Sequence, residues 1–91
     1  MFNYVYIPKS LNNGNLYVGY TNDLKRRFQE HNRGKNFSTK PRCPWQLIHY
    51  EAYLDIDDAK RREKYLKTNQ CPRLLKQMLK EYFYKLKSKN N

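Results

Sequence analysis

The Asn13–Gly14 dipeptide, which lies between two apolar runs, constrains the fold of this chain more than any other feature. Asn-Gly suits a two-residue turn between antiparallel strands because both residues accept positive φ angles. Such a turn places Asn12 opposite Asn15 and fixes which side chains share a face of the sheet. Residues 4–31 are therefore predicted to form a strand, a turn, a second strand and a helix. The face assignment survives a register shift of two residues but not of one.

The two faces of this predicted hairpin differ in chemistry. One face gathers three tyrosines and a glycine, namely Tyr4, Tyr6, Tyr17 and Gly19. The other face is mainly aliphatic and is expected to pack into the core; it holds Val5, Ile7, Leu16, Val18 and Tyr20. Tyrosine commonly fills half-buried strands, but that explanation accounts poorly for three tyrosines on one face of one hairpin.

The composition favours a small domain with a polyanionic partner. The 91-residue chain carries 19 Lys and Arg residues against 8 Asp and Glu, a formal net charge of +11. These cations are spread along the chain, which favours nucleic acid, with an anionic membrane surface as the alternative. No apolar run approaches the length of a membrane span, so no membrane partner and a cytoplasmic location are expected. Cys43 and Cys71 lack the spacing of zinc ligands and are expected to be free thiols.

The first helix is expected to begin near residues 21–23, which suit an N-cap, and to end at about Asn32. A period of 3.6 residues puts Leu24 and Phe28 on its inward stripe. Arg27 and His31 flank that stripe, one turn apart. An isolated arginine is usually a solvated charge, but Arg27 is positioned to lie beside the tyrosine face.

Residues 45–53 are rich in aromatic and β-branched side chains and predict a third strand. A second helix is predicted to open at Asp55, with an inward stripe of Ile56, Ala59, Glu63 and Leu66. Glu63 is the anomaly in this stripe, because burying an unpaired carboxylate costs several kcal/mol. Two kinds of partner are open: an ion pair with Arg62 or Arg27, or a divalent cation.

The remaining segments predict a basic loop, a third helix and a tail. The loop spans residues 33–44, and its candidates for binding nucleic-acid phosphates are Lys35, Lys40 and Arg42. Cys71-Pro72 is expected to start the third helix, whose wide apolar stripe belongs to the core. The chain is therefore divided into one domain over residues 1–85 and a basic, frayed tail over residues 86–91.

The order and separation of these features resemble the GIY-YIG nucleases. The first motif appears as Tyr4-Val5-Tyr6, with Tyr4 in place of the usual glycine, and the second as Tyr17-Val18-Gly19. The segments TNDLKRRFQEHNRGK and AKRREKYLK are similar to those of the small stand-alone members. These members also resemble the N-terminal nuclease domain of the bacterial excision-repair endonuclease. The resemblance covers residues 3–80.

This resemblance implies an α+β fold, a three-stranded antiparallel sheet flanked by about three helices. It also implies hydrolysis of DNA phosphodiester bonds with one Mg²⁺ or Mn²⁺ ion, and RNA is not excluded as a substrate. By matching position, Tyr6 would be the base or proton relay, and Tyr17 would assist it or orient water. Arg27 would hold the scissile phosphate, and His31 would assist proton transfer or phosphate binding. Glu63 would be the single metal ligand.

Asn69 is the nearest counterpart of the asparagine that often follows the glutamate in the family, and Tyr20 stands where some members carry lysine. The sequence thus predicts a metal-dependent endonuclease, in repair or in processing of structured DNA. The alternatives are a non-catalytic nucleic-acid-binding module that kept the fold and, more weakly, a protein-interaction adaptor. Little chain remains for a second DNA-reading element, so strict sequence specificity would require a homodimer or a separate targeting partner.

Overall fold

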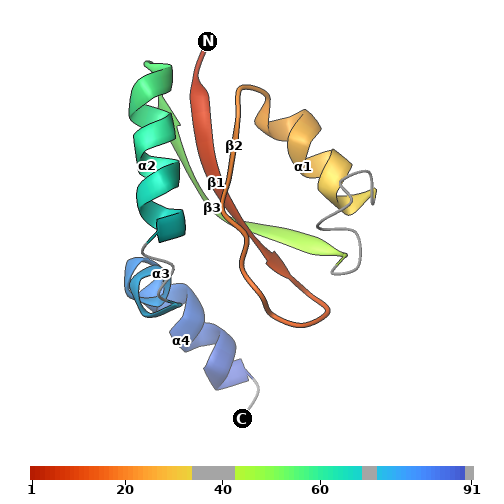
Figure 1. Cartoon of the computed structure of the whole chain (residues 1–91). Coiled ribbons are helices and arrows are strands. Elements are labelled where there is room, and N and C mark those ends of the chain that lie inside the picture. Colours follow the sequence, from red (N-terminus) through yellow and green to blue (C-terminus); the bar gives the residue numbers. More distant parts are fainter. Residues whose placement is uncertain (34–42, 69–71, 90–91) are drawn as a thin grey trace.

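The protein is an α+β structure in which helices surround a three-stranded antiparallel sheet (Figure 1). It is a computed structural model, which describes residues 1–33, 43–68 and 72–89. The elements in chain order are β1 (Asn3–Ser10), β2 (Gly19–Thr21), α1 (Leu24–Asn32), β3 (Trp45–Tyr53), α2 (Ile56–Thr68), α3 (Pro72–Met78) and α4 (Lys80–Lys89). The predicted fold class is confirmed. The described residues form four helices rather than about three, because the last predicted helix is divided into α3 and α4.

β1 is the central strand and lies between β2 and β3. β3 pairs along the length of β1, with one irregularity between Ile7 and Pro8. The strand predicted over residues 45–53 is therefore confirmed at both ends. On the other side of β1, Gly19 of β2 lies directly opposite Tyr6.

The hairpin between β1 and β2 closes with a longer loop than the predicted two-residue turn. The Ser10 backbone N–H donates to the Asn15 carbonyl at 2.8 Å, and the Gly14 N–H donates to the Ser10 carbonyl at 2.9 Å. The Ser10 hydroxyl oxygen accepts the N–H groups of Asn12 and Asn13, each at 3.2 Å, which stabilises the longer loop. Gly14 supplies the one positive φ angle of the described residues, 78°. The strands are therefore shifted by two residues from the predicted register.

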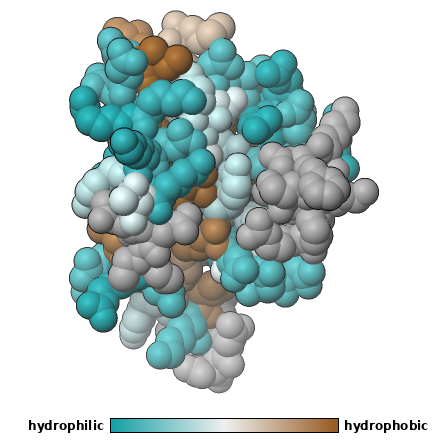
Figure 2. Space-filling view, in the orientation of Figure 1, coloured by the Kyte–Doolittle hydropathy of each residue, from teal (hydrophilic) through white to brown (hydrophobic). Residues whose placement is uncertain are grey.

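Helices α1 and α2 cover opposite faces of the sheet (Figure 1). The aliphatic core lies on the α2 face and comprises Val5, Ile7, Val18, Ala59, Leu66 and Leu75. Because a shift of two residues preserves the alternation of side chains, the predicted face assignment is confirmed. Tyr6 and Tyr17 accordingly lie on the α1 face, where their rings contact that of His31 on the helix. Figure 2 shows hydrophilic residues over much of the described surface in that view.

The C-terminal helix α4 packs against the start of strand β3. Tyr82 Oη of α4 donates a hydrogen bond to Gln46 Oε1 at 3.2 Å, and the Lys9 ammonium lies 5.1 Å from the Tyr82 ring centroid. Helix α4 continues to Lys89, into the segment that the sequence predicts to be a tail. The division of the chain at residue 85 stays a prediction.

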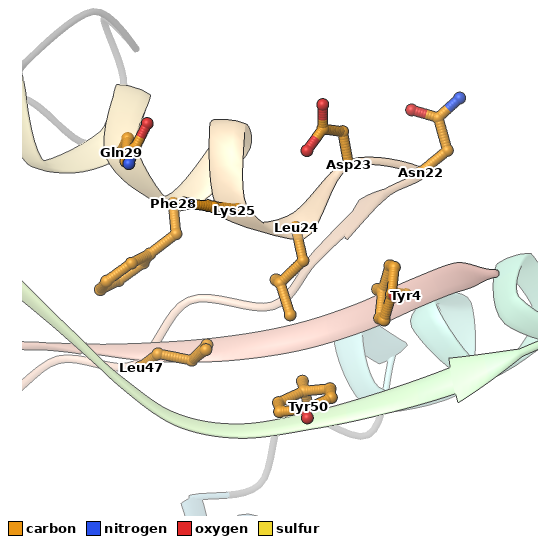
Figure 3. Close-up of a pocket in the computed structure, with 9 residues that line it drawn as sticks. All are labelled: Tyr4, Asn22, Asp23, Leu24, Lys25, Phe28, Gln29, Leu47 and Tyr50. Carbon is orange, nitrogen blue, oxygen red and sulfur yellow. The ribbon is translucent and has the colours of Figure 1, made fainter. Parts of the chain in front are cut away.

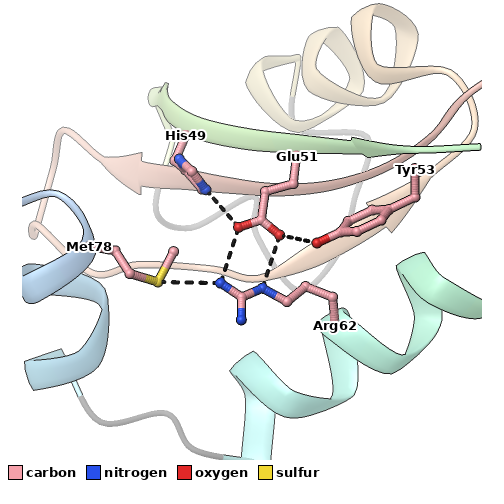
Figure 4. A network of polar contacts seen from close by, with 5 residues as sticks. All are labelled: His49, Glu51, Tyr53, Arg62 and Met78. Atoms are coloured by element: carbon pink, nitrogen blue, oxygen red, sulfur yellow. Dashed lines mark hydrogen bonds and ion pairs between the residues drawn. The ribbon is translucent and has the colours of Figure 1, made fainter.

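A partly buried carboxylate, Glu51, connects β3 to α2 (Figure 4). Glu51 Oε1 accepts hydrogen bonds from Arg62 Nε at 3.0 Å and from Tyr53 Oη at 2.6 Å. Glu51 Oε2 lies 3.0 Å from His49 Nε2 and 3.2 Å from Arg62 Nη2. Burial by itself would raise the pKa of Glu51, but the hydrogen bonds from Arg62, Tyr53 and His49 outweigh it and lower the pKa to about 2.

Glu51 is expected to make the stability of the fold depend on acid. Because its pKa is lower in the folded state, the unfolded state takes up the proton at a higher pH. The stabilisation is complete above the unfolded pKa of 4.5 and is lost as the pH falls toward 2. Replacing Glu51 by glutamine should therefore reduce the free energy of unfolding at neutral pH by about 2–3 kcal/mol and Tm by about 10–20 °C.

Thermal unfolding followed by circular dichroism from neutral to acidic pH checks this expectation. The Glu51→Gln variant should also lose less stability on acidification than the parent, because the group that titrates is gone. The matched control is Glu81→Gln, which removes an exposed carboxylate from the first turn of α4. If both variants melted like the parent at every pH, Glu51 would not hold the two elements together.

Candidate active site

A tyrosine, a histidine and a second tyrosine lie together between the sheet and α1. Tyr6 and His31 are fully buried, and Tyr6 Oη lies 2.7 Å from His31 Nε2. The Tyr17 ring centroid lies 6.4 Å from that of Tyr6 and 5.2 Å from that of His31. His31 therefore points more directly inward than the predicted flanking position, and it is the one buried residue of α1.

Trp45 and Asn32 support this cluster, and the sequence reasoning did not single out either residue. The Trp45 ring lies 6.3 Å from the rings of both Tyr17 and His31. Asn32 Nδ2 donates to the Trp45 carbonyl at 3.0 Å, and Asn32 Oδ1 accepts the Trp45 N–H at 2.5 Å. The amide thus ties the end of α1 to the first residue of β3, directly beside His31. The sequence shows Asn32 directly after His31, but it does not show that Asn32 binds Trp45, which lies 13 positions later.

The electrostatics of the cluster fix which group carries a proton at neutral pH. Burial raises the pKa of Tyr6 to about 12, against the lowering effect of a hydrogen bond from Arg27. Burial also lowers the pKa of His31, and the positive charge of Arg27 lowers it further. Tyr6 is therefore a neutral phenol beside a neutral imidazole. When the His31 proton is on Nδ1, the phenol donates the hydrogen bond between them and His31 Nε2 accepts it.

Arg27 lies beside the Tyr6 hydroxyl, as predicted, with part of its hydrogen-bonding capacity unused. Its Nη1 is 3.6 Å from Glu30 Oε1, a long ion pair at the surface. Among the described residues, Arg27 Nε is buried without a hydrogen-bond partner. A guanidinium with a free N–H next to a phenol is suited to bind an anionic oxygen of a phosphate.

Glu63 lies on α2, within electrostatic reach of this cluster. Its side chain is 17% exposed, and its Oε2 pairs with Lys67 Nζ at 3.1 Å, one turn along the helix. An ion pair with Arg27 or Arg62 was one of the two alternatives left open for Glu63. In the described residues, Arg62 pairs with Glu51 and Arg27 with Glu30 instead. The negative charge of Glu63 contributes to the raised pKa of Tyr6, so the carboxylate lies within electrostatic reach of the phenol.

A divalent metal fits this arrangement through Glu63 alone. The described residues contain no group of three or more His, Cys, Asp or Glu side chains that could hold a metal. Mg²⁺ commonly binds one or two carboxylates and takes its other oxygens from water and substrate phosphates. Lys67 neutralises the Glu63 carboxylate without a metal, and its ammonium is free to swing away because it is 46% exposed. The remaining predicted residues, Lys35, Lys40, Arg42 and Asn69, lie outside the described part of the chain.

Gly19 is the position that lets Tyr6 reach this cluster. A Cβ atom on Gly19 would lie 2.6 Å from both Cζ and Oη of Tyr6, far inside van der Waals contact. The glycine is therefore required by the close approach of the aromatic ring.

The Gly19→Ala variant is expected to push the Tyr6 ring away and break its hydrogen bond with His31. Such overpacking should lower the free energy of unfolding by about 1–3 kcal/mol. Chemical shifts of the His31 ring nitrogens report the hydrogen bond directly. Gly14→Ala is the control, because that substitution strains a turn but has open space around it. Unchanged His31 shifts in Gly19→Ala would contradict the required contact.

A separate hollow of about 520 Å³ lies on the other flank of α1, toward β3 (Figure 3). Its residues include Tyr4 and Tyr50, whose ring centroids are 6.0 Å apart, together with Phe28 and Leu47. Tyr4 shares the face of Tyr6 in the sheet, yet it lines this hollow. The tyrosine that replaces the usual glycine of the first motif therefore does not line the Tyr6 cluster.

Comparison with known proteins places the chain. The GIY-YIG catalytic domain matches residues 2–76, which include both strands of the hairpin, α1 and the helix that bears Glu63. The protein belongs to the GIY-YIG family, and the predicted resemblance is confirmed.

The relatives it resembles within that family are small proteins named UPF0213. One from Haloquadratum walsbyi is 40% identical over 68 residues, which cover 74% of this chain and 75% of that protein. One from Staphylococcus epidermidis is 42% identical over 66 residues, covering 71% and 79%. The solution NMR structure of a UPF0213 protein from Bacillus halodurans matches with a TM-score of 0.58 and 33% identity, over 88% and 84% of the two chains. Among the described residues, no helix combines the length and apolarity of a membrane span.

Proposed function

We propose that this protein is a metal-dependent endonuclease that hydrolyses DNA phosphodiester bonds, in repair or in processing of structured DNA. The main support is the hydrogen bond between the Tyr6 phenol and the neutral His31 imidazole, with Arg27 beside it. Membership of the GIY-YIG family supports the same reaction class. The proposed enzyme is a cytoplasmic protein with one domain over residues 1–85.

In the proposed reaction, Tyr6 and His31 pass a proton away from the attacking water. Tyr6 Oη takes a proton from water as its own proton moves to His31 Nε2, 2.7 Å away. The water oxygen attacks phosphorus, and the bond to the leaving oxygen breaks. The relay suits a buried phenol, because the phenol stays neutral before and after the transfer. Tyr17, next to both rings, orients the water.

Arg27 and Glu63 act on the phosphate. Arg27 holds the scissile group through the guanidinium N–H that has no partner among the described residues. Glu63 would hold one Mg²⁺ or Mn²⁺ ion, which would supply Lewis-acid stabilisation of the charge on the phosphate. A single protein carboxylate leaves the rest of the ion's coordination to water and substrate.

A cleavage assay with the purified protein tests the proposal. Its substrates are supercoiled plasmid and a panel of labelled duplex, nicked, branched and single-stranded DNA. Cleavage is expected with Mg²⁺ or Mn²⁺ and should disappear when EDTA is added. RNA of the same sequence is the comparison for substrate class. The non-catalytic alternative requires salt-dependent binding with no cleavage of any substrate at either metal, and that result would overturn the nuclease assignment.

A further inference from the structure

Three cationic side chains of the C-terminal helices line one surface groove and have no acidic partner among the described residues. The groove has a volume of about 510 Å³ and is lined by Arg73, Lys76, Gln77 and Lys80. Several other cations of the described residues pair with acids, among them Arg26 with Asp23, Arg61 with Asp58, Arg62 with Glu51 and Lys67 with Glu63. The groove therefore gathers positive charge that the described part of the protein does not neutralise.

The spacing of these residues keeps the charges together. Arg73 and Lys76 are three residues apart on α3, so they are neighbours on its surface. Lys80, the first residue of α4, lines the same groove. The opposite side of α3 is occupied by apolar residues that pack on the core, including Leu75. Like charges at this spacing repel one another, and a bound polyanion relieves that repulsion.

The groove also lies at the positive end of the chain. Residues 60–91 contain eleven of the Lys and Arg residues but only two acids, Glu63 and Glu81. The acids at the start of α2, Asp55, Asp57 and Asp58, lie at the other end of that helix, away from α3 (Figure 1). This asymmetry orients a polyanion toward α3 and α4.

We propose that the groove lined by Arg73, Lys76 and Lys80 is a second contact surface for nucleic acid, which binds phosphodiester oxygens away from the cleaved bond. The inference rests on the proposed function only for the identity of the polyanion. The sheet separates the α1 face, which holds Tyr6, from the α2 face on which α3 packs. The groove contributes affinity and leaves the chemical step to the Tyr6 cluster.

Binding of a labelled DNA duplex, followed by fluorescence anisotropy in EDTA over a range of salt concentrations, tests this surface. In the Arg73→Gln/Lys76→Gln variant, the slope of log affinity against log salt should decrease by about 2, because each lost phosphate contact removes about 1. Binding at low salt should weaken about tenfold or more. Melting temperature and helical content are expected to match those of the parent, since both side chains are exposed.

The control variant, Arg26→Gln/Arg61→Gln, removes the same formal charge from arginines that are already paired with aspartates. Its salt slope should stay close to that of the parent. Equal slopes in the two variants would overturn the proposal. So would loss of binding to phosphatidylserine vesicles with unchanged DNA binding, which would identify an anionic membrane instead. The assay contains no metal and no cleavage, so it is informative even if the protein proves not to be a nuclease.

Discussion

Replacing Glu63 by glutamine is expected to abolish metal-dependent cleavage while leaving the fold intact. Glutamine keeps the size of the side chain but cannot offer the charged oxygen that a hard divalent cation prefers. Loss of the metal removes several kcal/mol of transition-state stabilisation, so single-turnover cleavage should fall by about 1,000-fold or more. The Glu63–Lys67 pair is partly exposed, and its loss should change Tm little.

The control for this variant is Asp58→Asn, which removes another carboxylate from α2. The Asp58 carboxylate pairs with Arg61, whose side chain is exposed. Its cleavage rate should stay within a factor of about two of the parent. Titration with Mn²⁺ in the presence of an uncleavable phosphorothioate substrate separates metal binding from chemistry. Equal Mg²⁺-dependent cleavage rates in Glu63→Gln and the parent would exclude Glu63 as the metal ligand.

The Tyr6→Phe variant is expected to show the second-largest loss. It keeps the buried ring but deletes the hydroxyl that lies 2.7 Å from His31 Nε2. A positioned proton-transfer group contributes about 100- to 10,000-fold, so kcat should fall within that range. Affinity for DNA should change little, because Tyr6 is fully buried and the phosphate is held by Arg27. Loss of the hydrogen bond between Tyr6 and His31 should lower the free energy of unfolding by about 1–2 kcal/mol.

Tyr4→Phe is the matched control, because Tyr4 lies two residues away on the same strand and face but lines the separate hollow. It should cleave DNA at the parental rate. The pH profile adds a readout that a structural role would not move. The parent should lose activity as acid protonates His31, and Tyr6→Phe should show a flatter profile in that range. Parental kcat in Tyr6→Phe would exclude the relay.

Local patterns predicted the fold well because they act through neighbouring residues. Alternation in the hairpin, the composition of residues 45–53 and the acidic start of α2 each specified an element that the structure contains. The predicted register of the hairpin was wrong by two residues, because the Ser10 hydroxyl stabilises a longer loop than the Asn-Gly dipeptide predicts. The break between α3 and α4 was missed for a related reason, since the apolar stripe continues across it.

The site was predictable in its members and less so in their partners. Spacing along α1 placed Arg27 and His31 near the tyrosine face, and the structure brings them to Tyr6. The pairing of Glu63 with Lys67 was not predicted. Arg62, one of the arginines considered for that pair, instead binds a carboxylate on β3 that lies eleven positions earlier. Contacts between residues distant in the chain depend on how the helices dock, and periodicity does not carry that information.

Different helices cover the two faces of the sheet, so the candidate site residues come together at different stages of folding. The hairpin and α1 can bring the phenols, Arg27 and His31 together before the second helix is in place. Glu63 joins them only after α2 has docked on the opposite face, beside the short outer strand β2. A ribosome-bound copy that has folded only its first half therefore lacks the acid. The proposed nuclease activity is therefore expected only once α2 has docked.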